Sequence, residues 1–263
     1  MSAAGSASTL LASRIEDAGL NASAPPEQRW LDGWLLRFSP GKAKRARCIN
    51  AVADGRLPLG ERLQHALALY REVGLPPLLR VTPFTLPTVL EDHVSALGWQ
   101  RLDDTRVMLL PDLQQALRGR PAGADALPTP QPLTALELAD LVGMLRGSPA
   151  VQRQAHARRL LAAPVPFQGF VLRDGEVVLA CGQFAREAEL VGLYDVITAP
   201  HARERGLGGA LCHWLLTRAA AEGARHAYLQ VEADNAGARS VYERLGFTDA
   251  YRYHYRAPEP EIV

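Results

Sequence analysis

The sequence predicts an α/β (α+β) protein in which two mixed-sheet domains lie in tandem, each with a central, mostly antiparallel sheet flanked by helices. Short strand-like runs are interspersed with segments in which apolar residues recur at helical spacing. The two halves also repeat one order of elements. In each half a helix, a strand and a second helix follow one another, ending at Gly74, Val81 and Gly98 in the first and at Gly223, Val231 and Gly246 in the second.

The first domain is expected to span residues 1–120 and to hold three helices and four strands. A chain of 263 residues, 48% hydrophobic, is long enough for one large or two small domains. Apolar spacing predicts helices that begin near residues 10, 59 and 88, and each ends at a glycine. The strands are predicted over residues 34–38, 48–52, 78–81 and 99–110, the last of which should close this half.

Residues 121–132, rich in Pro, Gly and Ala, are predicted to be a linker because they lack any apolar period. The second domain is expected over residues 133–263. Its predicted helices lie near residues 136–145, 152–161, 207–222 and 236–245, the last of them capped by Asn235. Its predicted strands cover residues 167–172, 177–184, 191–198, 228–231 and 248–256.

A glycine-rich loop between the strand 191–198 and the helix 207–222 is the most informative stretch of the chain. Its sequence is Arg203-Glu204-Arg205-Gly206-Leu207-Gly208-Gly209. Glycines let a backbone turn tightly and bring its N–H groups close to a ligand, and the helix that follows adds unpaired donors and a positive dipole end. The loop therefore predicts an anion site whose expected occupant is a phosphate or pyrophosphate.

Two common nucleotide-binding patterns fail at this loop. Gly206 and Gly208 are not followed by a Lys-Ser or Lys-Thr pair, which disfavours a nucleotide triphosphate P-loop. The dinucleotide-binding fingerprint requires a small residue where this chain has Leu211. That fingerprint also opens a βαβ unit, whereas the loop of this chain follows a predicted hairpin.

The pattern Arg-x-x-Gly-x-Gly at residues 203–208, with Asn235 and Tyr242 downstream, resembles the GNAT superfamily of acyl-CoA-dependent N-acyltransferases. The resemblance covers about half of the chain, from near Leu133 to the end. The first half looks like a degenerate domain of the same fold, which makes the chain similar to tandem GNAT proteins. Where the second half has its glycine loop, the first has residues 56–60, and Pro58 removes one of the donors that an anion needs.

The resemblance implies that acetyl-CoA is bound as co-substrate, without a metal. Main-chain N–H groups of the loop would take the pyrophosphate, and the splayed strands beside it would bind the pantetheine arm. Tyr242, two turns along the helix from Asn235, would be catalytic by protonating or hydrogen-bonding the leaving thiolate. The cofactor-binding residues expected on this basis are Val196, Ile197, Thr198, Arg203, Glu204, Arg205, Gly206, Leu207, Gly208, Gly209 and Asn235.

The identity of the general base stays open. Some relatives have a glutamate where this chain has Gln230, and an amide cannot accept the proton of the amine. The carboxylates on neighbouring strands are Asp195, Glu187, Glu189 and Glu232, and an ordered water is a further possibility. Alternation is expected to put Asp195 on the opposite sheet face from Tyr194 and Val196, and no spacing selects one group.

The basic run of Lys42, Lys44, Arg45 and Arg47 has two interpretations. It could contact the adenosine 3′-phosphate or an acidic substrate across the domain interface, or it could be the solvated flank of a hairpin. The formal net charge of +1 argues against nucleic acid or an anionic membrane as the main partner.

The chain is expected in the cytoplasm, because it has neither a signal-like N-terminus nor a window of ~18 apolar residues. We expect it to be a monomer or a homodimer. Its three cysteines are far apart, so they are expected to be reduced and buried. Cys212, just after the loop, could be proposed as a nucleophile, but packing of its helix is the preferred interpretation.

These observations predict an N-acetyltransferase that transfers an acetyl group from acetyl-CoA to a primary amine by direct attack in a ternary complex. The alternative is a non-catalytic acyl-CoA-binding sensor or scaffold module, for which Gln230 is the clue. A structural protein with a vestigial site is a third class.

Overall fold

The computed structural model describes residues 3–118 and 128–258 of the chain. In these residues the strands form one mixed sheet in the order β1-β2-β3-β4-β11-β5-β10-β9-β8-β7-β6. Its helices are α1 (Ala3–Ala22), α2 (Leu59–Glu72), α3 (Leu90–Ala96), α4 (Leu113–Ala116), α5 (Ala135–Leu145), α6 (Ala150–Ala162), α7 (Leu207–Ala221) and α8 (Ala236–Arg244). Its strands are β1 (Glu27–Leu31), β2 (Trp34–Phe38), β3 (Ile49–Ala51), β4 (Leu79–Val81), β5 (Gln100–Leu110), β6 (Gln131–Leu133), β7 (Phe167–Asp174), β8 (Val177–Glu187), β9 (Leu190–Thr198), β10 (His226–Glu232) and β11 (Thr248–Ala257).

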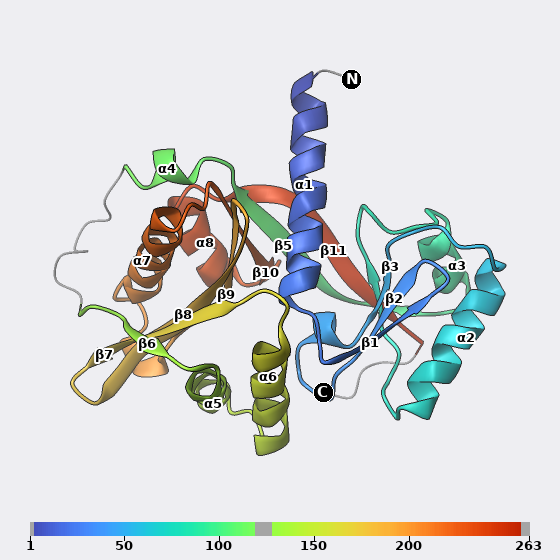
Figure 1. The fold of residues 1–263 in the computed structure, drawn as a ribbon, viewed down its shortest axis with the longest axis horizontal. Coiled ribbons are helices and arrows are strands. Elements are labelled where there is room, and N and C mark those ends of the chain that lie inside the picture. Colours follow the sequence, from blue (N-terminus) through green and yellow to red (C-terminus); the bar gives the residue numbers. More distant parts are fainter. Residues whose placement is uncertain (1–2, 119–127, 259–263) are drawn as a thin grey trace.

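The predicted α/β class with a large, helix-flanked sheet is confirmed (Figure 1). Sequence patterns missed two of the strands. β1 is mostly exposed and pairs with β2, and β6 occupies the end of the predicted linker, where it pairs antiparallel with β7. Residues 121–127 of that linker lie outside the described part of the chain.

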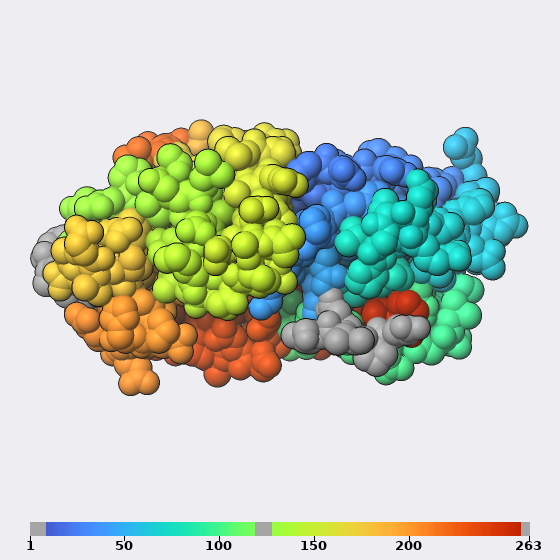
Figure 2. Space-filling model, turned by 90° about the horizontal axis from the view of Figure 1, so that it is seen from below, coloured from blue at the N-terminus to red at the C-terminus, as the bar shows by residue number. Residues whose placement is uncertain are grey.

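The two halves exchange one strand each at the centre of the sheet. β5 follows α3 in the first half, but it lies between β11 and β10 of the second half, so it does not close its own half as expected. β11 follows α8 in the second half and pairs with β4 of the first. Figure 1 shows these two long strands side by side where the halves meet, and Figure 2 shows the halves adjoining along the middle of one face.

The second half of the sheet carries a different helix layer on each face. Phe170 and Leu172 of β7 pack in a core cluster with α7, whereas Val171 between them packs with α5 and α6. Because successive side chains of a strand point to opposite faces, α7 lies on one face and α5 and α6 on the other. The first half has a core of its own, built around Trp34, Tyr70 and neighbouring apolar residues.

Helix α1 connects the first half to the second. Figure 1 shows it rising from the middle of the molecule, beside β5 and β9. Arg14 Nη1 donates to Glu189 Oε1 at 2.8 Å, and Asn21 Nδ2 donates to both carboxylate oxygens of Glu187 at 3.1 Å. The turn between β8 and β9 is thereby bound to α1.

Cys48, Cys181 and Cys212 are free and buried, as the sequence predicted. Burial raises the pKa of the Cys212 thiol to about 12, which keeps it protonated at neutral pH and makes it a poor nucleophile. No described helix is long and apolar enough to cross a bilayer.

Candidate functional site

The loop between β9 and α7 presents a run of backbone donors without backbone partners. After a short 3₁₀ turn, Pro200–Ala202, the residues Glu204 (φ 60°) and Gly206 (φ 73°) adopt left-handed conformations. Such alternation can turn successive N–H groups toward one point and create an anion-binding concavity. Within the described chain, no backbone hydrogen bond is donated between the N–H of Arg203 and that of Ala210, which reaches the Gly206 carbonyl at 3.1 Å.

Gly208 makes close contact between the loop and the end of β9 possible. A Cβ at this position would lie 3.0 Å from Thr198 Oγ1, and Gly209 would place one 3.5 Å from Val241 of α8. The end of β9 and helix α8 therefore both approach the first turn of α7. Side chains at positions 208 and 209 would fill the space that the two glycines leave open beside the backbone donors. Leu207 is buried in the core, so its side chain anchors the turn.

Strands β9 and β10 separate beside this loop. Their parallel pairing runs from Leu190 opposite His226 to Leu193 opposite Leu229 and goes no further, although β9 continues to Thr198. The side chains of Val196 and Ile197 pack into clusters on opposite sheet faces. Their backbone edge toward β10 thus faces a gap in the ladder, the arrangement in which an extended ligand arm can replace a strand.

Helix α8, which lies beside the first turn of α7, is capped by one of the two downstream motif residues and contains the other. Asn235 is its N-cap, with its side-chain oxygen accepting from the Ala238 N–H at 3.1 Å. Tyr242 is half-buried, and its ring packs edge-on against Phe247 with centroids 6.1 Å apart. Burial, and to a lesser extent the neighbouring Cys212, raises the pKa of the Tyr242 hydroxyl, so it stays protonated.

The corresponding turn of the first half carries an internal anion. The Asp32 carboxylate accepts from the backbone N–H groups of Arg56 and Leu57 at 2.8–2.9 Å, just before α2 begins. These two hydrogen bonds lower the pKa of Asp32. Pro58, which was expected to remove a donor, is the N-cap of α2. Asp32 therefore already occupies the two backbone donors that directly precede Pro58 and α2.

Asp195 lies at a bulge in β9, two residues past the last pair with β10. It accepts from Gln183 Nε2 at 2.6 Å, lies 2.9 Å from Arg146 Nη1, and lies 3.1 Å from His156 Nε2. Burial alone would raise the pKa of Asp195. The contact with His156 has the larger opposing effect, and together with the charges of Arg146 and Arg159 it holds this pKa far below its usual range.

The bulge overturns one prediction about the faces of β9. Strict alternation was expected to separate Asp195 from Tyr194, yet Tyr194 lies opposite Gln183 in the register and Asp195 binds the side chain of that same Gln183. Both therefore lie on the face of α5 and α6, because the positive φ of Asp195 (50°) inserts an extra residue. No apolar pattern in α5 or α6 had indicated a role for Arg146 or His156.

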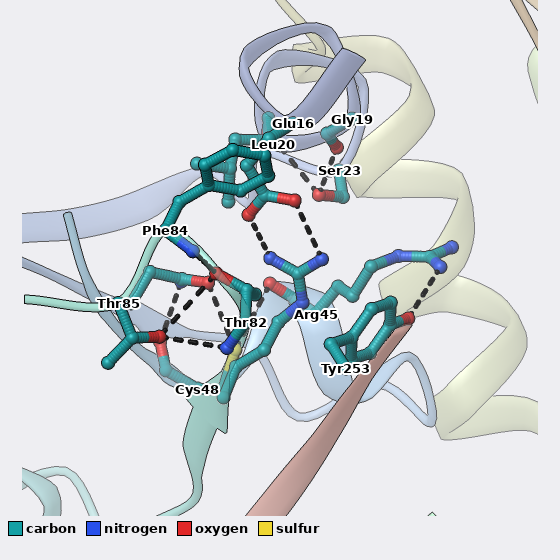
Figure 3. A network of polar contacts seen from close by, with 12 residues as sticks. Glu16, Gly19, Leu20, Ser23, Arg45, Cys48, Thr82, Phe84, Thr85 and Tyr253 are labelled. Atoms are coloured by element: carbon teal, nitrogen blue, oxygen red, sulfur yellow. Dashed lines mark hydrogen bonds and ion pairs between the residues drawn. The ribbon is translucent and has the colours of Figure 1, made fainter. Parts of the chain in front are cut away.

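Gln230, at the open side of β10, is bound by residues from other parts of the chain. Its Oε1 accepts from Arg45 Nη1 of the first half and from the Tyr253 hydroxyl at 2.8 Å. Figure 3 shows Tyr253 reaching Arg45 from β11, with Glu16 of α1 nearby. Of the four residues in the basic run, Arg45 thus points into the junction of the halves rather than into solvent.

The remaining carboxylates considered as bases are placed differently. Glu187 and Glu189 are engaged with α1, and Glu232 is exposed at the end of β10. The structure therefore places Tyr242, Val196 and Leu207 of the loop in one core cluster, and of these carboxylates it places Asp195 and Glu232 beyond the last β9–β10 pair.

A mixed sheet with two separating strands beside a glycine-rich helix start defines a GNAT-type fold, and comparison with solved structures agrees. A GCN5-related N-acetyltransferase from Kribbella flavida superposes with a TM-score of 0.68 at 16% identity, covering 95% of this chain and 96% of that one. A tandem GNAT protein from the clavulanic acid biosynthesis pathway gives 0.58 at 17% identity, over 77% of this chain and 70% of that one.

The family is shown by sequence. The model of the family described as "Probable histone acetyltransferase Rv0428c C-terminal" matches residues 12–256, so the chain belongs to that family. The "Uncharacterized N-acetyltransferase YobR" of Bacillus subtilis is 24% identical over 87% of this chain and 91% of its own length. A mycothiol acetyltransferase of Streptomyces griseus is 44% identical over 84 residues, 31% of this chain and 27% of that protein.

Proposed function

We propose that this protein is an N-acetyltransferase that transfers an acetyl group from acetyl-CoA to a primary amine within a ternary complex. The observation that carries the proposal is the run of unpaired backbone donors at residues 204–209 next to the gap between β9 and β10. Membership of an acetyltransferase family supports it.

In this proposal the loop donors hold the pyrophosphate, and the exposed Arg203 and Arg205 add positive charge. The backbone of residues 196–198 holds the pantetheine arm along the open edge of β9. Asn235, whose side chain caps α8, contributes to the same site. These roles belong to the second domain, residues 133–263, while the first, residues 1–120, has its equivalent donors occupied by Asp32.

The thioester of acetyl-CoA supplies the acyl group. The nitrogen lone pair of the neutral amine forms a bond to the carbonyl carbon, the carbon–sulfur bond breaks, and the thiolate leaves with that electron pair. The Tyr242 hydroxyl, which burial keeps protonated, donates a hydrogen bond that stabilises the leaving thiolate. The amine loses one proton, and we assign it to solvent water because the strongly held Asp195 is a weak base.

Thiol release tests the proposal. The protein is mixed with acetyl-CoA and a panel of primary amines, and free thiol is followed for the wild type and Tyr242→Phe. We expect release with at least one amine and a fall in kcat of about a hundredfold in the variant. Tyr255→Phe is the control, because Tyr255 is a buried tyrosine of β11 that packs in a different apolar cluster from Tyr242 of α8.

The second candidate is an acyl-CoA sensor, which Gln230 favours because an amide bound by Arg45 and Tyr253 cannot accept a proton. A sensor would bind CoA but release no thiol with any amine. In a thermal shift assay, CoA at 100 times its Kd should stabilise either form by about 2.7 kcal/mol. No stabilisation by CoA would contradict both candidates.

The proposal includes a cytoplasmic location, which three free, buried cysteines fit.

A further inference from the structure

A cationic cleft lies between the two halves, next to the point where β9 leaves β10. Its walls come from α5 and α6, from Asp195 on β9 and from residues 39–43 of the first half. Figure 2 shows α5 and α6, in lime and yellow, against the blue first half on this face. If the thioester lies in the strand gap, as proposed above, this cleft is where an incoming amine would place the rest of its structure.

The charges of the cleft are unbalanced. Four cationic side chains line it, Lys42, Arg146, Arg153 and Arg159, against one carboxylate, Asp195. Arg146 pairs with Asp195, and Arg153 pairs with Asp140 at 2.9 Å outside the lining. Lys42 and Arg159 thus have no carboxylate within salt-bridge distance in the described chain.

Arg159 differs from the exposed Lys42 because it is buried, with only 9% of its surface exposed. Its Nη1 donates to the Ala22 carbonyl at 3.3 Å, and its guanidinium lies 6.0 Å from the centre of the Phe167 ring. Neither partner carries a charge. A buried guanidinium is normally paired with a carboxylate or phosphate, since removing a cation from water is costly without a counter-ion. Burial, with Arg45 and Arg146 nearby, lowers the pKa of Arg159 despite Asp195, in line with this deficit.

We propose that the cleft recognises an acceptor amine that also carries a carboxylate, with Arg159 and Lys42 binding that carboxylate. A guanidinium can receive a planar carboxylate through two parallel hydrogen bonds, which fixes both its position and its orientation. The first half then contributes Lys42 to substrate choice, although it does not hold the cofactor. This inference rests on the proposed function for the identity of the reacting group.

Matched amine pairs test the inference. Straight-chain ω-aminoalkanoates of four to six carbons are each compared with the alkylamine of the same length, so that members of a pair differ only in the carboxylate. We expect kcat/KM, measured by thiol release, to favour the aminoalkanoate by about tenfold or more for the best length. Arg159→Gln and Lys42→Gln should each reduce this preference while leaving kcat/KM for the alkylamine within about twofold.

Arg158→Gln is the control, because Arg158 directly precedes Arg159 in α6 but is exposed and does not line the cleft. It should keep the full preference. Lys42 is exposed, so Lys42→Gln reports on the cleft even if Arg159→Gln fails to fold. Equal kcat/KM within every pair for the wild type, or a preference that survives both variants, would overturn the inference.

Binding separates this inference from the proposed function. The N-acetyl derivatives of the same pairs are titrated calorimetrically into the protein with CoA, which requires no turnover. Tighter binding of the carboxylate member, lost in Lys42→Gln, supports the cleft even if no thiol is ever released. Equal binding, or no binding by either member, contradicts it, whereas absence of thiol release with every amine contradicts only the proposed transferase.

Discussion

At the scale of single residues, the two equivalent turns differ in whether the chain itself supplies an anion to the backbone donors. In the first half Asp32 accepts the backbone N–H groups of Arg56 and Leu57, while in the second half Gly208 leaves the donors before α7 open. In the first half, a carboxylate of the chain itself competes with any external anion for these donors, and in the second half none of the described side chains does so.

Gly208→Ala should weaken CoA binding by about tenfold or more, since the new Cβ would lie 3.0 Å from Thr198 Oγ1 in front of the donors. The free energy of unfolding should change by less than about 1 kcal/mol, because alanine is also the better helix former. Calorimetric titration with CoA and urea unfolding measure the two effects. Gly237→Ala, in the first turn of α8 with no atom within 4 Å of the new Cβ, is the matched control and should leave CoA affinity unchanged. Equal affinity of the Gly208 variant and the wild type would remove the loop from the site.

The buried pair of Glu16 and Arg80 should make stability depend on pH. Burial alone would raise the pKa of Glu16, but the charge of Arg80 and its hydrogen bonds lower it below 4.5. The unfolded chain then binds the proton more readily, so the contribution of Glu16 is fully present above pH 4.5 and is lost as the pH falls through the folded-state value. Glu16→Gln should cost about 3 kcal/mol at neutral pH, because it leaves Arg80 buried without its counter-ion. Urea unfolding of both proteins from neutral to acidic pH should show the difference shrinking; a constant difference would contradict the pairing.

At the scale of elements, α8 depends on a single cap at its exposed N-terminus. Asn235→Ala removes the acceptor for the Ala238 N–H and should cost about 1 kcal/mol of the free energy of unfolding, whereas Asn235→Asp should retain most of it. If Asn235 also contacts the cofactor, the alanine variant should bind CoA more weakly beyond any effect of stability. Chemical denaturation with and without saturating CoA separates the two roles. An unchanged unfolding midpoint for Asn235→Ala would show that the cap contributes nothing.

The elements around the loop were predictable because they carry local signals. Apolar spacing and the glycines that follow them placed α7 and α8 close to their observed bounds, and Asn235 marked the start of α8. A strand-like apolar run placed β9. β1 carried no such signal, since most of its side chains are exposed, and so it was missed. The cleft residues Arg146 and Arg159 could not be inferred either, because their roles depend on the bulge at Asp195 and on a neighbour from the other half.

At the scale of the whole molecule, the repeat was visible in the sequence and the strand exchange was not. Helix, strand and helix recur in both halves at matching glycines, but nothing local distinguishes a strand that closes its own half from one that crosses to the other. β5 and β11 both cross, so each half completes the sheet of the other. The exchange also explains how residues 39–43 and Arg45 of the first half come to border a site built on the second.

The exchange leads us to expect that the halves do not fold independently, because the core around α7 includes residues on both sides of the predicted division at residues 121–132. A fragment of residues 121–263 lacks β5, which leaves one edge of β10 unpaired and removes Met108, Leu110 and Leu113 from the core around α7. The full chain should unfold in one cooperative transition in calorimetry, and the fragment should show no such transition and no CoA-dependent stabilisation. A full chain cut by a protease at a site inserted after residue 120 is the control: because β5 and β11 remain paired, the two pieces should elute together and still bind CoA. A fragment 121–263 that folds alone and binds CoA with the affinity of the full chain would show instead that the exchanged strands are dispensable and that the second domain is autonomous.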